Sequence, residues 1–142
     1  MRYMLIMRST SEAQTAAKDI PFDDIINAMG EYNESLIKAG VLLGGEGLTD
    51  AKEGLVVDFA STPPVVTDGP YAEAKELFSG FWILETSTKE EAAEWARRCP
   101  LGPGSTLEVR RIIEASEFDQ DNEHIKREVA WRAENEQGVV AG

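Results

Sequence analysis

The most constraining feature of this sequence is a strand signal that runs directly into a helix start. Residues 79–86 combine aromatic and β-branched side chains, which is typical of a β-strand. Immediately afterwards, Thr88 and Glu91 have the spacing of a capping box, in which each side chain bonds backbone N–H groups at the helix start. Small and apolar residues at helical spacing follow, and Pro100 ends the segment. A strand followed at once by an amphipathic helix predicts a mixed α and β fold.

Five further segments extend this unit. Residues 3–7 form a short apolar run, and residues 107–113 alternate apolar with charged side chains, which indicates two more strands. Residues 54–59 and 65–67 read as two short strands separated by a doubled proline. A long first helix is indicated by apolar residues at the spacing of one helix face, namely Phe22, Ile25, Ile26, Met29, Tyr32, Leu36 and Ile37.

The order of these elements predicts a ferredoxin-like βαββαβ sandwich with inserted hairpin material. This is an α+β fold in which two helices cover one face of an antiparallel sheet. The other face would carry aromatic residues near Phe81 and Trp82, and this apolar surface needs another layer packed on it. A second copy of the chain can supply that cover. We therefore expect a homodimer that packs sheet to sheet, with pockets near the interface.

The chain length suits one domain followed by a tail. The 142 residues suffice for a single domain with one core, which we place at residues 1–115. Residues 116–142 form an acidic C-terminal extension. Its weak helical stripe consists of Phe118, Ile125, Val129 and Ala133. Such a stripe is too narrow to form a core alone, so we expect a partly helical tail that docks on the domain or on its partner.

Charge and cysteine content narrow the functional classes. A net charge of -12 argues against direct nucleic-acid binding, which needs a clustered basic surface. The acidity fits either a solvated surface or recognition of a basic partner. The single cysteine, Cys99, excludes an internal disulfide and points to a reducing compartment. No segment has the length of a membrane span or of a signal peptide, so we expect a cytoplasmic protein without membrane contact.

The segment from Gly44 to Leu48 contains three glycines and Glu46. Glycines at this density serve either a phosphate cradle or a bulge followed by a tight turn. The spacing fits neither a dinucleotide fingerprint nor a P-loop, because no helix with a Lys-Ser or Lys-Thr pair follows. We therefore expect a structural bulge and turn.

The best candidate site is the Asp68-Gly69-Pro70 turn. A turn holds an aspartate in one rotamer, because its side chain accepts backbone N–H groups. That role can be purely structural. In the functional interpretation, Asp68 is a general base or a ligand acceptor, Lys75 is a counter-charge and Tyr71 contributes a hydroxyl. We add Glu46 and Glu73 as candidate ligand-binding residues, and note that Glu73 and Glu76 could also be solvated charges.

Other familiar mechanisms find little support in the sequence. His124 is the only histidine and lies in the acidic tail, outside the predicted domain, which argues against nucleophilic triads. Cys99 fits a small core residue better than a nucleophile, because no basic group is evidently placed to ionise it. Carboxylates such as Glu46, Asp68 and Glu73 could hold a hard cation, but their spacing does not demand one. We predict no cofactor and no metal.

Taken together, these motifs resemble the DGPF branch of the YCII-related proteins. The resemblance rests on Arg2-Tyr3-Met4, the segment 40–48, the run from Thr67 to Glu76 and Gly80-Phe81-Trp82, and it covers residues 1 to about 113. It implies a dimeric ferredoxin-like fold of the α/β-barrel type. It also implies an association with extracytoplasmic-function sigma factors, since many members resemble companions of these factors in bacteria.

The resemblance implies less about activity. A His-Asp pair has been proposed for the wider family, but the matching region of this chain contains no histidine, so only an aspartate such as Asp68 could remain from it. Tyr71 stands where the branch usually has Phe, which adds a hydroxyl. Ala74 stands where Thr is common, which removes one.

Two functional hypotheses follow. In the first, the homodimer binds a small polar molecule in a pocket lined by Glu46, Asp68, Tyr71 and Lys75, and whether Asp68 also performs acid-base chemistry is left open. In the alternative, the protein is a non-catalytic partner of transcription machinery and acts through its acidic surface and tail.

Overall fold

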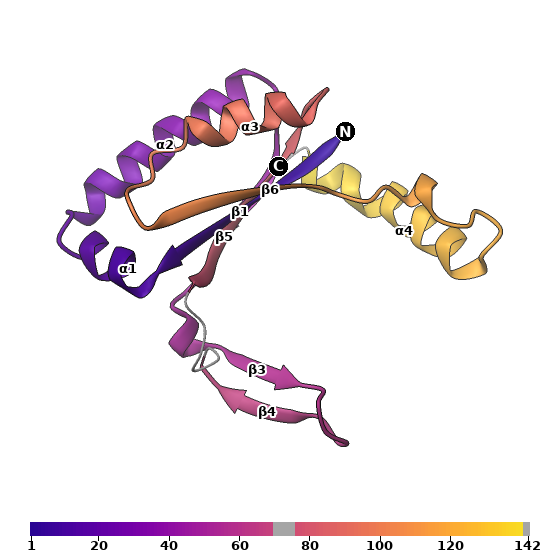
Figure 1. Ribbon diagram of the computed structural model, residues 1–142. Coiled ribbons are helices and arrows are strands. Elements are labelled where there is room, and N and C mark those ends of the chain that lie inside the picture. The colour runs from indigo at the N-terminus through magenta and orange to yellow at the C-terminus, as the bar shows by residue number, and fades with distance from the viewer. Residues whose placement is uncertain (70–75, 141–142) are drawn as a thin grey trace.

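The computed structural model describes residues 1–69 and 76–140, with side chains described through residue 135 (Figure 1). The strands are β1 (Arg2–Thr10), β2 (Leu42–Gly47), β3 (Leu55–Asp58), β4 (Val65–Asp68), β5 (Glu76–Glu85) and β6 (Ser105–Arg111). The α-helices are α1 (Ser11–Ala17), α2 (Phe22–Lys38), α3 (Lys89–Arg97) and α4 (Glu123–Val140). Two short 3₁₀ helices, η1 (Ala51–Glu53) and η2 (Ala115–Glu117), lie in connecting segments.

The main sheet has the strand order β2-β5-β1-β6, and each neighbouring pair is antiparallel. Helices α2 and α3 lie on one face of this sheet, and α4 extends from its side as an arm (Figure 1). This arrangement is the expected ferredoxin-like α+β fold with an added C-terminal helix, so the predicted fold class is confirmed. The domain boundary placed at residue 115 stays a prediction.

The glycine-rich segment is a strand rather than the tight turn that its composition predicts. Leu42–Gly47 forms the edge strand β2, and the register shift between Leu42 and Gly44 agrees with the expected bulge. A Cβ atom on Gly45 would lie 2.8 Å from the Phe81 carbonyl oxygen and 3.2 Å from Cδ1 of Trp82. The absence of a side chain at Gly45 therefore allows β2 to approach β5 closely.

The two short strands predicted around the doubled proline do not join the main sheet. In the described part of the chain, β3 and β4 pair only with each other, and their hairpin projects away from the rest of the fold (Figure 1). The second strand of the main sheet is β2. The hairpin lies between the second and third strands of the ferredoxin-like order, and it is inserted hairpin material of the kind that the sequence predicts.

The core lies between the sheet and the helical layer. Leu5 of β1, Leu84 of β5 and Leu36 of α2 are fully buried. The Tyr32 ring meets the Trp82 ring edge to face, with 5.7 Å between centroids. Both polar ends find partners, because the Tyr32 hydroxyl donates to the Trp95 carbonyl oxygen and Trp82 Nε1 donates to Asn33 Oδ1. Trp82 therefore faces the helices, and the expectation that it lies on the other sheet face is wrong.

The helix ends match their sequence signals in part. The Thr88 hydroxyl accepts the backbone N–H of Glu91, as the capping box predicts, but the Glu91 carboxylate accepts from Ser87 rather than from Thr88. Helix α1 has no counterpart in the sequence analysis, because it is polar. It begins where the Thr10 hydroxyl accepts the N–H of Ala13.

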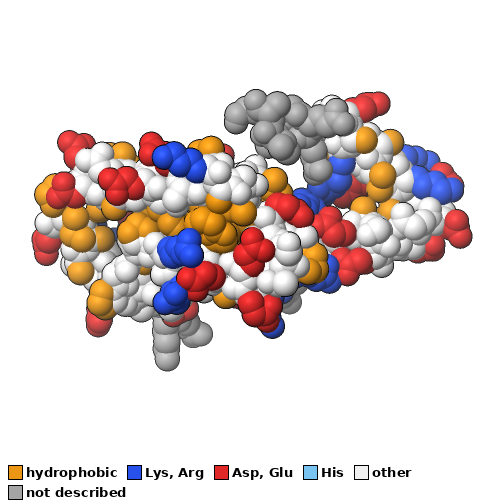
Figure 2. All heavy atoms as spheres, turned by 90° about the horizontal axis from the view of Figure 1, so that it is seen from above, with side chains coloured by type: hydrophobic (Ala, Val, Ile, Leu, Met, Phe, Trp, Pro, Cys, Tyr) orange, Lys and Arg blue, Asp and Glu red, His pale blue; other side chains and the backbone are white. Residues whose placement is uncertain are grey.

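Helix α2 buries less of its apolar side than its pattern suggests. Tyr32 and Leu36 are buried, whereas Phe22, Ile26 and Ile37 are largely exposed. Figure 2 looks onto the helical layer and shows hydrophobic side chains along its middle, with charged side chains around them and the α4 arm to the right. At the end of α3, Cys99 is half-buried, and burial raises the pKa of its thiol to about 12. The thiol is therefore protonated at neutral pH, in agreement with a packing role.

The close approach at Gly45 gives a matched pair of variants. Gly45→Ala should lower the free energy of unfolding by about 1–3 kcal/mol, because its methyl group forces β2 away from β5. Gly44→Ala should change it by less than about 0.5 kcal/mol, because a Cβ atom there meets open space. Urea unfolding measures the free energy of unfolding of both variants. Equal decreases in the two variants would show that the close approach of β2 to β5 is not the reason for glycine at position 45.

Candidate functional site

Asp68 is the last residue of β4 and lies at the base of the projecting hairpin. It pairs with Leu55 across the hairpin. The next residue, Gly69, has a φ of 74°, a left-handed conformation that favours glycine, and its N–H donates to the Gly54 carbonyl oxygen over 2.9 Å. The Asp-Gly pair thus ends the hairpin at a fixed point. The Asp68 side chain is exposed.

One face of the hairpin is apolar, and Asp68 shares it. Because alternate residues of a strand point to the same side, Leu55 and Val57 lie on one face together with their partners Asp68 and Val66. The exposed fraction is 60% for Leu55, 40% for Val57 and 59% for Val66. We call this set the hairpin face. It places a carboxylate beside uncovered apolar surface.

The other predicted site residues are only partly placed. Tyr71, Glu73 and Lys75 lie outside the described residues. Glu46 lies on β2, opposite Phe81 of β5, and its side chain is exposed. Among the described residues, no hydrogen bond or ion pair joins Glu46 to Asp68. Their convergence on one pocket therefore stays a prediction.

The sheet face opposite the helices is apolar in its middle and charged at one side. The pairs Met4–Ile83 and Ile6–Phe81 lie on this face, because the alternate residues of the same strands face the helices. Phe78 packs near Phe81, with 6.4 Å between ring centroids. We call this the open face. Along one side of it, the Arg8 guanidinium pairs with Glu108 at 3.2 Å.

A cavity of about 590 Å³ lies between α4 and one end of the open face. Its walls include Leu43 and Ile83 from the sheet, Phe118 from the connecting segment, and Val129 and Trp131 from α4. We call it the α4 cavity. Asp68 and Glu46 do not line it. Sequence reasoning did not find this cavity, although the weak stripe at Phe118, Ile125 and Val129 supplies part of its wall.

Two arginine–glutamate pairs hold the segment that leads into α4. Arg2 of β1 donates through Nε and a terminal nitrogen to both carboxylate oxygens of Glu114. Arg111 at the end of β6 donates to both oxygens of Glu117 at 2.7 Å. Arg2 lowers the pKa of Glu114. Hydrogen bonds from Arg111 and from the Glu114 backbone N–H lower the pKa of Glu117 to about 2.

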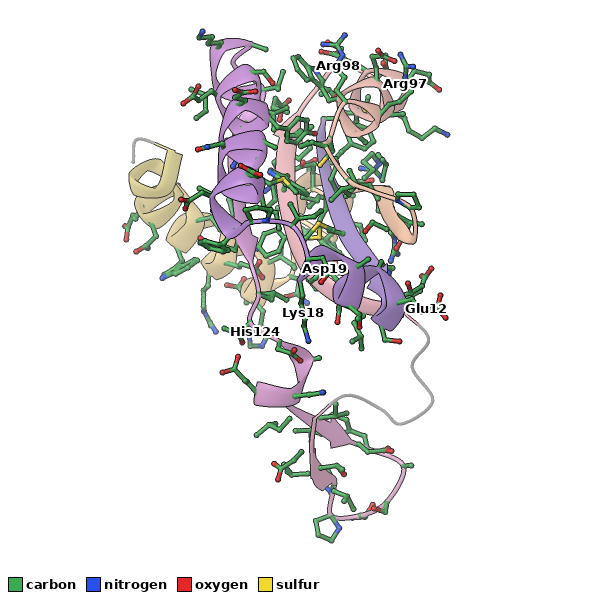
Figure 3. All side chains as sticks on the ribbon, turned by 90° about the vertical axis from the view of Figure 1, so that its left-hand side faces the viewer. Glu12, Lys18, Asp19, Arg97, Arg98 and His124 are labelled. Atoms are coloured by element: carbon green, nitrogen blue, oxygen red, sulfur yellow. The ribbon has the colours of Figure 1, made fainter. Side chains whose placement is uncertain are left out.

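Histidine and metal chemistry find no assembled site in the described residues. His124 lies in the first turn of α4, on the arm (Figure 3). The described residues contain no group of three or more His, Cys, Asp or Glu side chains arranged to hold a metal ion. Within that same part of the chain, no helix is both long and apolar enough to cross a membrane.

The family-model match ends before α4. Residues 1–116 match the family model of the YCII-related domain. The comparison with curated proteins finds no match. Among solved structures, the chain is similar to a 5-chloro-2-hydroxyhydroquinone dehydrochlorinase from Burkholderia phenoliruptrix AC1100 in complex with 2,5-dihydroxybenzoquinone. The sequence identity is 14% and the TM-score is 0.46, over 84% of this chain and 100% of that chain.

The Arg111–Glu117 pair predicts a pH-dependent stability. Because the folded pKa of Glu117 lies below its ordinary value, its stabilising effect is present above about pH 4.3 and is lost as the pH falls toward 2. The melting temperature of Glu117→Gln should therefore be slightly below that of the wild type at pH 6, with the difference vanishing near pH 2. Arg111→Gln and the double variant should follow the same profile. A difference that persists unchanged at the lowest pH would contradict this assignment.

Proposed function

The chain belongs to the YCII-related family, and we propose that it is a homodimer that binds a small polar molecule beside the Asp68-Gly69-Pro70 turn, with Asp68 as an acid-base group. The observation that carries this proposal is the hairpin face, where an exposed carboxylate stands at the end of exposed apolar side chains. The exposed apolar side chains of this face are not expected of a hairpin that stays in water.

The hairpin face supports dimer formation because a two-stranded hairpin has little stability of its own. Isolated hairpins in water are marginal unless a further layer packs on them. In this chain the hairpin projects from the sheet, and Leu55, Val57 and Val66 are uncovered. A second copy can cover the hairpin face and the open face in one symmetric contact. With a charge of -12 on each chain, apolar burial must drive that contact.

Covering the hairpin face would also change the surroundings of Asp68. Its neighbours on that face are apolar, so docking of a second copy would exclude water from the carboxylate and leave it facing a bound molecule. Water exclusion strengthens the interaction of a carboxylate with a polar ligand. We include Glu46, Tyr71, Glu73 and Lys75 as proposed ligand-binding residues, because Glu46 lies on the open face and the other three follow the turn in sequence.

A charge placed on the hairpin face tests the dimer. Val66→Asp should shift the protein from dimer to monomer in sedimentation velocity, because the new carboxylate would be buried without a partner. Val65→Asp is the matched control, because Val65 lies on the opposite face of the same strand and is similarly exposed. A wild type that sediments as a monomer, or an equal effect of the two variants, would contradict the proposed interface.

Replacement of Asp68 tests the ligand site. In a thermal-shift screen against polar metabolites, a compound that stabilises the wild type should lose its effect on Asp68→Asn, since binding to the folded state raises the melting temperature. Asp58→Asn is the matched control, because Asp58 lies on the other hairpin face and accepts the Ala60 N–H, a bond that asparagine can keep. Compounds that stabilise both variants equally would remove Asp68 from the site.

The exposed Trp131 favours a second candidate function, a regulatory contact with an extracytoplasmic-function sigma factor. This side chain lies at the wall of the α4 cavity and is 60% exposed, which offers an aromatic anchor to a partner on the acidic C-terminal extension. Affinity purification of the full chain should enrich a sigma factor, and removal of residues 123–142 should abolish that enrichment while leaving the circular dichroism of the domain intact. Equal enrichment by both forms, or none by the full chain, would contradict this function.

A further inference from the structure

We propose that the α4 cavity is a binding site for a small, neutral aromatic molecule. This site is separate from the Asp68 turn, although Ile83 belongs both to its wall and to the open face. Seven of its thirteen lining residues follow residue 116, where the match to the YCII-related domain ends. The site would therefore be an addition that this chain makes to the domain.

The size and chemistry of the cavity fit a small molecule. Its volume of about 590 Å³ lies within the range of small-molecule sites, which are mostly apolar with a few polar groups. Leu43 and Ile83 form the sheet side, and Ile125 and Val129 form the helix side. Phe118 and Trp131, also on the wall, remain 48% and 60% exposed. Exposed aromatic rings on an apolar wall offer flat surfaces on which a planar ligand can stack.

The segment before α4 keeps this space open. The Arg2–Glu114 pair ties it to the start of β1, and the N–H of Ile112 donates to the Arg2 carbonyl oxygen over 2.9 Å. The Arg111–Glu117 pair then fixes the turn that leads toward the helix. Because bidentate arginine–carboxylate pairs define an orientation as well as a distance, the segment up to Glu117 leaves the domain in a set direction. The sheet and α4 enclose the cavity on either side of this segment.

The charges on the lining favour a neutral ligand. The lining contains two arginines and two glutamates, and they form ion pairs within the lining, Arg2 with Glu114 at 3.0 Å and Arg132 with Glu128 at 3.0 Å. The charges of the lining therefore sum to zero. A charged ligand would compete with an existing pair for its counter-charge, whereas a neutral aromatic molecule would leave both pairs undisturbed.

The test is a fluorescence titration of the full-length protein with N-phenyl-1-naphthylamine, a neutral aromatic dye that brightens in apolar surroundings. We expect saturable binding of one dye per chain. Phe118→Ala should weaken binding about fivefold, since one stacking surface is lost. Phe59→Ala is the matched control, because Phe59 is 78% exposed on the hairpin connection and does not line the cavity. Its affinity for the dye should equal that of the wild type.

A second variant guards against loss of folding. Ala115→Trp should abolish dye binding by filling the cavity from its wall, while circular dichroism and the sedimentation coefficient stay unchanged. Absence of saturable binding to the wild type would overturn the proposal, as would binding that both cavity variants leave intact. An equal loss in Phe59→Ala would place the dye on the hairpin. A shift of Ala115→Trp from dimer to monomer would assign the cavity to a second copy of the chain, which also overturns the proposal.

Discussion

The packing of Leu5 and Trp82 against Tyr32 and Leu36 is the contact on which the rest of the molecule depends. It commits one face of the sheet to the helices, and it fixes which side chains of β1 and β5 point the other way. A shift of one residue in the pairing would exchange the two faces. The open face and the sheet side of the α4 cavity are therefore consequences of how the core is packed. The hairpin face lies outside this core and is set by the register of β3 with β4.

The sequence predicted those elements whose signals lie within a few neighbouring residues. The strand at residues 79–86 and the helix cap at Thr88 depend on neighbours in sequence, and both are present. Gly45 could not be interpreted in the same way, because its role depends on Trp82, which lies 37 positions further along the chain. Helix α1 was missed because its polar residues form no apolar stripe, so pattern reasoning had nothing to detect.

The candidate sites also differ in whether neighbouring or distant residues determine them. The left-handed conformation of Gly69 agrees with a turn after Asp68, which the sequence predicts because turn chemistry is local, whereas the role of Asp68 in a site stays a prediction. The apolar neighbours of Asp68 emerge only from the hairpin register, which pairs Leu55 with Asp68. The α4 cavity could not be predicted at all, because the Arg2–Glu114 pair that frames it joins residues 112 positions apart. The position of this cavity therefore depends on contacts between residues that are far apart in the sequence.

The most direct test of the account is hydrogen exchange at the amides of residues 55–68 as the protein concentration is raised. If a second copy covers the hairpin face, protection should increase with concentration and reach a plateau when the dimer is saturated, while core amides such as that of Leu84 stay protected throughout. Hairpin amides that exchange at one rate at all concentrations would show that the hairpin face stays in water. Asp68 would then lack the enclosed surroundings that the proposed function requires.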